Sequence, residues 1–218
     1  HAARVEAVWP DAKKKSVEAT EAQSERVTEA REAYKTQQAT MVVDELVFLD
    51  ESGVNTRMMR SHARAPRGQR AVDHQPKARG TNYTVIGALT TTGIVASHLL
   101  DGSMRKPEFL RYLEEELFPR LKKGAAIVMD NLRIHHCEEA QSLATAHGFT
   151  FIFVPPYSPK FNPIEEAWSK LKAFLRKTRA RLADTLVEAV REGLDRITTK
   201  DAHGWIRHAG YHIQAGST

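Results

Sequence analysis

Three carboxylates of this chain stand in settings that suit metal-dependent chemistry. Asp50 closes an apolar run at residues 46–49, and Asp130 closes a second apolar run at residues 125–129. Glu165 lies 35 positions after Asp130 (165 − 130 = 35), just past an Asn-Pro pair where a helix is predicted to begin. Hard divalent cations take oxygen ligands, and two of them about 3.5–4 Å apart stabilise the attacking and leaving oxygens of a phosphodiester displacement. Two strand-end aspartates and one helical glutamate therefore have the composition of a two-metal phosphodiester site.

The segments that must position these carboxylates follow a mixed α/β pattern. Short apolar runs predict strands at 46–49, 83–89, 94–99, 126–129 and 149–154. Helical periodicity predicts helices at 106–121, 138–146 and from Pro163 to about residue 177. The capping-box spacing of Thr185 and Glu188 predicts one more helix. This order predicts a mixed sheet with helices packed on it.

The predicted helix after Pro163 separates two neighbouring acids. At 100° per residue, Glu165 lies on the flank of the apolar stripe that contains Trp168, whereas Glu166 points almost opposite and is expected to be a solvated surface acid. Lys172 and Arg176 fall on the same side as Glu165. The pattern therefore favours Glu165 as a metal ligand, with basic groups beside it that could hold phosphates.

Composition narrows the class of protein. The formal charge of +5 and the pI near 9.3 are a weak indication of a polyanionic partner. Cys137 is the only cysteine, which excludes an intrachain disulfide and a cysteine zinc cluster and fits a reducing compartment. His135 and His136 beside Cys137 lack further ligands for a transition metal. No apolar stretch approaches the roughly 18 residues of a membrane span, so no membrane partner is expected.

Two regions outside the predicted core carry further expectations. Seven basic side chains occupy residues 57–79, namely Arg57, Arg60, Arg64, Arg67, Arg70, Lys77 and Arg79. This segment either contacts DNA phosphates, mainly through Arg64, Arg67 and Arg70, or is a solvated loop. Residues 1–40 are charged and alanine-rich, and their thin apolar stripe predicts a peripheral helix or linker. The chain begins with His1 rather than methionine, so a fragment or processed piece is expected.

Several motifs together resemble those of the DDE transposases of the mariner superfamily, most closely the bacterial insertion sequence 630 branch. They are Leu49-Asp50-Glu51-Ser52, Met129-Asp130-Asn131-Leu132 with His135, Pro155-Pro156-Tyr157-Ser158-Pro159, and Asn162-Pro163-Ile164-Glu165 with Trp168. Residues 65–70 and 207–211 also look like that branch. The resemblance covers about residues 42–211. The Asn-Pro-Ile-Glu segment, at its spacing from the second aspartate, is the most specific part of it.

The resemblance implies an RNase H-like fold, a mixed five-stranded sheet flanked by helices, at residues 41–218. It implies that Asp50, Asp130 and Glu165 bind two Mg²⁺ ions, for which Mn²⁺ substitutes. The implied activity is metal-dependent cutting of double-stranded DNA at transposon ends, followed by strand transfer into target DNA. A homodimer in the bacterial cytoplasm, associated with the nucleoid, is expected. Residues 1–40 then represent the tail of an N-terminal DNA-binding region that this chain lacks.

Some features leave alternatives open. Lys160 stands where the family often has an acid, and Phe161 where leucine is usual, but neither position supplies a metal ligand. Asn131 and His135 either orient Asp130 or touch DNA. A catalytically inactive remnant that binds DNA or oligomerises is the main alternative function, and a structure-specific nuclease on the same core is a third. Mg²⁺-dependent cleavage separates the first alternative from a transposase, and strand-transfer products separate the second.

Overall fold

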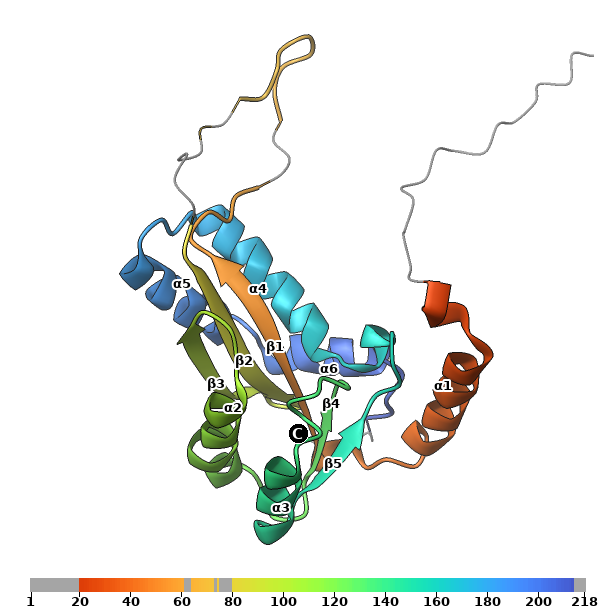
Figure 1. Ribbon diagram of the computed structural model, residues 1–218. Helices are drawn as coiled ribbons and strands as arrows, with labels where there is room; N and C mark the ends of the chain where they lie inside the picture. Colours follow the sequence, from red (N-terminus) through yellow and green to blue (C-terminus); the bar gives the residue numbers. More distant parts are fainter. Residues whose placement is uncertain (1–19, 61–63, 73, 75–79, 214–218) are drawn as a thin grey trace, which may run out of the picture.

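A five-stranded mixed sheet forms the centre of the molecule (Figure 1). The computed structural model describes residues 20–60, 64–72, 74 and 80–213. The strands, in the spatial order β3-β2-β1-β4-β5, are β1 (Leu46–Asn55), β2 (Asn82–Thr90), β3 (Gly93–Asp101), β4 (Ala126–Met129) and β5 (Thr150–Phe153). β1, β2 and β3 pair antiparallel, whereas β1, β4 and β5 pair parallel. The mixed five-stranded sheet expected from the sequence is confirmed.

Helices cover both faces of this sheet (Figure 1). They are α1 (Glu25–Gln38), α2 (Lys106–Arg111), α3 (Glu138–Ala146), α4 (Ile164–Thr178), α5 (Ala183–Asp195) and α6 (Thr199–His208). α2 continues through a π-helical turn (Tyr112–Leu117) and a 3-10 turn (Phe118–Arg120), and further 3-10 turns are Thr20–Gln23, Val43–Glu45 and Pro159–Phe161.

Strand β1 contributes to two separate hydrophobic cores because successive side chains of a strand point to opposite faces. Leu46 and Phe48 pack in the core that contains α4, α5, α6 and Tyr34 of α1. Val47 and Leu49 pack in the second core, with α2 and α3. The four-residue apolar run is therefore buried on both sides, as expected for a central strand.

Strand β1 is longer than the sequence predicted, which changes the setting of Asp50. The expected strand ended at residue 49, but β1 continues to Asn55 because its second half pairs with β2. Parallel pairing with β4 ends at Phe48. Asp50 therefore lies in the middle of β1, although just beyond the end of the β1–β4 ladder, and Asp130 follows β4 directly. The prediction that Asp50 terminates its strand was wrong, but both aspartates do lie at the carboxyl ends of the paired parallel segments.

The C-terminal helices also differ in part from expectation. Thr185 does not cap α5 from outside, because the helix begins at Ala183 and the Thr185 Oγ1 instead accepts from the Leu182 amide at 3.2 Å. Helix α6 was not predicted. Its capping box pairs Thr198 with Asp201, the amide of each residue donating to the other's side chain. Among the described residues no helix combines the length and apolar character needed to cross a membrane.

Helix α1 packs on the core rather than lying free of it. Val27, Tyr34 and Gln38 are buried, and the Gln38 amide donates to the Ala209 carbonyl at 2.9 Å. The predicted helix is therefore present, and its contacts with the core are more extensive than its thin apolar stripe indicated. Residues 1–19 of the predicted linker, and Lys77 and Arg79 of the basic segment, lie outside the described residues.

Candidate active site

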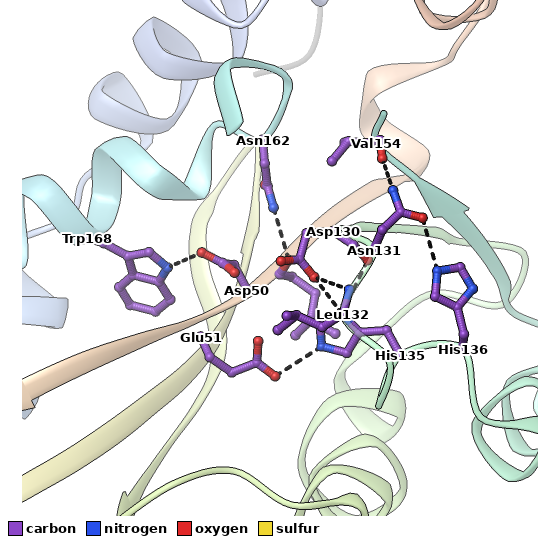
Figure 2. Close-up of polar contacts among 11 residues, drawn as sticks. Asp50, Glu51, Asp130, Asn131, Leu132, His135, His136, Val154, Asn162 and Trp168 are labelled. Carbon is purple, nitrogen blue, oxygen red and sulfur yellow. Dashed lines mark hydrogen bonds and ion pairs between the residues drawn. The ribbon is translucent and has the colours of Figure 1, made fainter. Parts of the chain in front are cut away.

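Asp50 is held against helix α4 by an indole. The Trp168 Nε1–H donates to Asp50 Oδ2 at 2.9 Å, and both residues are buried (Figure 2). Asp50 pairs across the sheet with Gly87 of β2. A Cβ at Gly87 would lie 2.8 Å from the Trp168 ring, so only glycine leaves room for the indole there. The sheet and α4 together fix the orientation of Asp50.

Burial and neighbouring charge both act on the Asp50 carboxyl. Burial is the larger effect, and the charges of Glu165, Glu51 and Asp130 add to it, so that the pKa of Asp50 rises to about 8. The carboxylates of three elements, β1, the turn after β4 and the start of α4, are therefore close enough for their charges to repel one another. The structure thus brings Asp50, Asp130 and Glu165 toward one region, and their role as metal ligands stays a prediction.

Asp130 has a different environment, with hydrogen-bond donors around it. Its Oδ1 accepts from the Leu132 amide at 3.0 Å and lies 2.8 Å from the Nδ1 of His135 (Figure 2). Burial by itself would raise the pKa of Asp130, but these hydrogen bonds outweigh burial and hold the pKa below its usual range. The Asp130 side chain is 40% exposed, so an ionised carboxylate faces solvent at this edge of the sheet.

His135 connects Asp130 to a fourth acid, Glu51. The ring is fully buried against Phe109, and its Nε2 lies 3.1 Å from Glu51 Oε1. Because a carboxylate only accepts, both ring nitrogens must donate, which makes the ring an imidazolium. Burial would lower the pKa of His135, but the bonds to Asp130 and Glu51 raise it to about 10. The other oxygen of Glu51, Oε2, is buried without a hydrogen-bond partner.

The role of His135 settles one of the open alternatives. A fully buried imidazolium with both nitrogens engaged is not presented to DNA, so its predicted DNA contact is contradicted and it orients Asp130 instead. Glu51 was missed in the sequence. The signal in the sequence was a second acid next to Asp50 in a buried strand. The residue that Glu51 contacts, His135, lies 84 positions later in the chain.

Asn131 links the ends of two strands. Its Nδ2 donates to the Val154 carbonyl, and its Oδ1 accepts from His136 Nε2 at 3.0 Å (Figure 2). The His136 ring stacks on Phe153 of β5 with centroids 3.9 Å apart. Asn131 therefore joins the end of β4 to the end of β5, and its side chain is still exposed.

Glu165 lies in the first turn of α4. Its side chain reaches solvent, yet the surrounding protein partly desolvates the carboxyl and, with the charge of Asp130, raises the pKa of Glu165, while Lys172 opposes the rise. Glu166 is not the more solvated of the pair, contrary to expectation. It is half-exposed, with its Oε1 3.4 Å from His208 Nδ1, because the end of α6 packs beside it.

Comparison with protein-family models assigns the chain to a family. The family described as DDE superfamily endonuclease matches residues 45–187. The chain belongs to that family. A search of curated proteins found no significant match.

Solved structures of the Mos1 transposase share the fold of this DDE endonuclease domain. The Mos1 paired-end complex with the left transposon end aligns with a TM-score of 0.76 at 15% identity, covering 94% of this chain and 64% of that one. The mariner paired end complex with Mn aligns at 0.72 and 14% identity, covering 96% and 69%. The Mos1 catalytic domain with Raltegravir and Mn aligns at 0.64 and 12% identity, covering 91% and 100%. This chain thus spans less than two thirds of the first of these, and the shared architecture is the RNase H-like fold.

The donor set of this DDE domain fits a hard divalent cation, because it consists of carboxylate oxygens whose mutual repulsion a cation would relieve. Within the described ranges, no three His, Cys, Asp or Glu side chains already form a ready cation site. Asp50 is directed to Trp168 and Asp130 to His135. Cation binding would therefore have to draw the three predicted ligands closer together.

Basic side chains lie on two surfaces of the domain, one beside α4 and one in the connection between β1 and β2. Lys172 and Arg176 line a groove of about 580 Å³, together with Asn55 and Asn82 at the far ends of β1 and β2. The predicted DNA contacts of the β1–β2 connection, Arg64, Arg67 and Arg70, are all exposed. Figure 1 shows the described residues 64–72 of this connection (orange) away from the sheet, beyond the C-terminal end of α4. Both surfaces are accessible to a polyanion.

Proposed function

We propose that this chain is the catalytic part of a DDE transposase of the mariner superfamily, of the insertion sequence 630 branch. Its proposed activity is to cut DNA at transposon ends and to join the freed 3′ end to target DNA. The observation that carries the proposal is that Asp50, Asp130 and Glu165 approach from three elements, near enough for the charges of neighbouring carboxylates to raise the pKa values of Asp50 and Glu165. Membership of the DDE endonuclease family and the shared fold support it.

Asp50, Asp130 and Glu165 would hold two Mg²⁺ ions, or Mn²⁺ in their place. When bound, such ions activate the attacking water or 3′-hydroxyl and neutralise charge on the leaving oxygen. The chain's own part is to keep Asp130 ionised through His135, to fix Asp50 through Trp168, and to present Glu165 from the first turn of α4. Asp50 must release a proton on binding a cation at neutral pH, since its pKa is about 8.

The proposed partner is double-stranded DNA, held mainly through phosphates. Lys172 and Arg176 lie about two and three turns after Glu165 on the same side of α4, which supports a strand path along the groove beside α4. Residues 41–218 would be the catalytic domain and residues 1–40 the connection to a DNA-binding region. A homodimer in the bacterial cytoplasm, at the nucleoid, completes the proposal.

The decisive test compares Glu165→Gln with Glu166→Gln in a Mg²⁺-dependent nicking assay on DNA that carries a transposon end. Glutamine keeps the size and hydrogen bonding of glutamate but removes the charge that a cation requires. Glu165→Gln should reduce cutting at least about 10²-fold. Glu166→Gln should retain near wild-type activity, because a half-exposed ion pair contributes under about 1 kcal/mol.

The opposite ranking of these two variants would refute the ligand assignment. Binding without any cutting by the wild type would favour the inactive remnant, and cutting without strand-transfer products would favour a nuclease.

Replacing Arg64, Arg67 and Arg70 together by alanine should weaken DNA binding and flatten its salt dependence. Unchanged salt dependence would remove these three side chains from the phosphate contacts.

A further inference from the structure

The chain between β5 and α4 decides where Glu165 lies. Residues 157–162 contain the 3-10 turn Pro159–Phe161, and the Glu165 amide donates to the Asn162 carbonyl at 3.2 Å as α4 begins. The Asn162 side chain donates to the Leu49 carbonyl at 3.0 Å, directly before Asp50. The 157–162 segment thus sets the distance between Glu165 and the strand that carries Asp50.

This segment contains a backbone conformation that needs external support. Tyr157 has a φ of 54°, in the left-handed region that non-glycine residues rarely adopt. Such a residue persists where surrounding contacts hold it in place. The adjacent Ser158 is buried, and its hydroxyl donates to the Pro156 carbonyl at 3.0 Å.

Supporting contacts come from Arg31 of helix α1, which lies beside the chain between β5 and α4 (Figure 1). The Arg31 guanidinium donates to the Tyr157 carbonyl at 2.7 Å and to the Ser158 hydroxyl at 2.9 Å, and its third bond goes to the Ala22 carbonyl at 2.9 Å. One planar group therefore joins the turn before α1 to both residues at the start of the 157–162 segment. A guanidinium presents its donors in a fixed fork, so this contact restricts orientation as well as distance.

A second contact from α1 holds the other end of the segment. The Tyr211 hydroxyl donates to the Phe161 carbonyl at 2.8 Å, and the Tyr34 and Tyr211 hydroxyls lie 2.8 Å apart. Because the single hydrogen of Tyr211 is used on Phe161, Tyr34 must be the donor to Tyr211. The Tyr34 and Phe161 rings also pack, with centroids 5.0 Å apart. Both tyrosines are buried.

From these contacts we infer that Arg31 and Tyr34 of α1 are positioning residues for Glu165, acting through the 157–162 segment. The inference rests on the proposed role of Glu165 as a ligand, and it makes α1 part of the catalytic unit. The two ends of the segment are fixed independently. The Arg31 guanidinium holds residues 157 and 158, and the hydrogen-bonded hydroxyls of Tyr34 and Tyr211 hold Phe161. Loss of either contact frees one end of the connection that leads into α4.

The test uses the full chain and three variants, Arg31→Ala, Arg31→Lys and Tyr34→Phe. The matched control is Arg26→Ala, an exposed arginine on the same helix. Amide hydrogen exchange of residues 157–165 is followed by mass spectrometry in metal-free protein. Arg31→Ala should exchange about tenfold faster there, since it loses two charge-assisted hydrogen bonds. Tyr34→Phe should show a smaller increase confined to the Phe161 end, and Arg26→Ala none.

Mn²⁺ affinity, measured by electron paramagnetic resonance, distinguishes positioning from general stability. Arg31→Ala should bind Mn²⁺ several-fold more weakly than the wild type, and Arg31→Lys should recover part of the loss. Unchanged exchange at residues 157–165, or faster exchange with wild-type Mn²⁺ affinity, would overturn the inference. A wild type without Mn²⁺ binding would instead contradict the proposed function, and the exchange data alone would then decide whether α1 holds Glu165.

Discussion

Asp50, within β1, and Asp130, directly after β4, lie just beyond the end of the same parallel ladder but in opposite environments. Asp50 is 8% exposed and is surrounded by an indole and by three other acids, and its pKa rises to about 8. Asp130 is half-exposed and accepts a hydrogen bond from an imidazolium, and its pKa falls. One carboxyl is favoured in its neutral form and the other in its ionised form.

This difference shows how a cluster of acids is tolerated before any cation binds. Four mutually repelling carboxylates would be costly if all were ionised. The buried imidazolium of His135 compensates Asp130 and Glu51, and protonation of Asp50 removes a third charge. The cluster is therefore divided into a compensated half, formed by Asp130, Glu51 and His135, and a protonated half, formed by Asp50.

The largest expected effect on stability comes from removing His135, which compensates the charges of Asp130 and Glu51. His135→Ala leaves Glu51 and Asp130 without their cation, and breaking a buried ion pair from one side costs about 3–5 kcal/mol. The free energy of unfolding, from urea denaturation, should fall by that amount. His136→Ala is the matched control, because this neighbouring ring is exposed and should cost about 1 kcal/mol or less. Equal losses in the two variants would show that His135 compensates no charge.

An intermediate effect on stability, which depends on pH, is expected from the protonated carboxyl of Asp50. The folded pKa of Asp50 is about 8, above the value of about 4 in the unfolded chain, so its contribution to stability is complete below pH 4 and is lost as pH rises through 8. Asp50→Asn lacks this loss. Its stability relative to wild type should therefore increase between pH 4 and 8, by at most about 1.4 kcal/mol per pH unit.

Thermal unfolding in the presence of a chelator measures this difference. Asp101→Asn, at the exposed end of β3, is the control and should show no such trend. A difference between Asp50→Asn and wild type that stays constant from pH 4 to 8 would mean that Asp50 is ionised throughout, and the contrast with Asp130 would disappear.

The smallest effect should come from the hydrogen bond between Trp168 and Asp50. Trp168→Phe keeps an aromatic ring against Gly87 but removes the N–H, which should cost about 1 kcal/mol for the lost bond. The same variant should leave Asp130 unaffected, and carboxyl carbon chemical shifts in a pH titration measure both groups. A change at Asp130 as large as that at Asp50 would mean that the two halves are not separate.

Local patterns predicted the strands, most helices and the three carboxylates, because buried runs and helical periodicity are properties of neighbouring residues. They did not predict that Asp50 lies within β1, since residues 51–55 are held by pairing with β2 rather than by their own apolar character. The function of His135 depends on Glu51, and no local pattern connects residues so far apart in the chain.

Helix α1 illustrates the same limit. Its apolar stripe is thin, so the sequence indicated a peripheral element. Its anchoring comes from Arg31 and Tyr34, whose partners lie more than a hundred positions later. Helix α6 was missed for a different reason: its capping box uses Asp201 in place of the usual glutamate or glutamine.

Helix α4 carries both Glu165 and Trp168, which are three positions apart (168 − 165 = 3) and therefore on neighbouring parts of one face. Trp168 is seated on Gly87, so the helix cannot slide or turn without moving the indole that holds Asp50. In mechanical terms, Glu165 and Trp168 move as one rigid helix, whereas Asp130 and His135 follow β4 and are tied to Glu51 of β1. A shift of α4 would thus displace Glu165 and the indole that binds Asp50 together, while Asp130 keeps its contacts with His135 and Leu132.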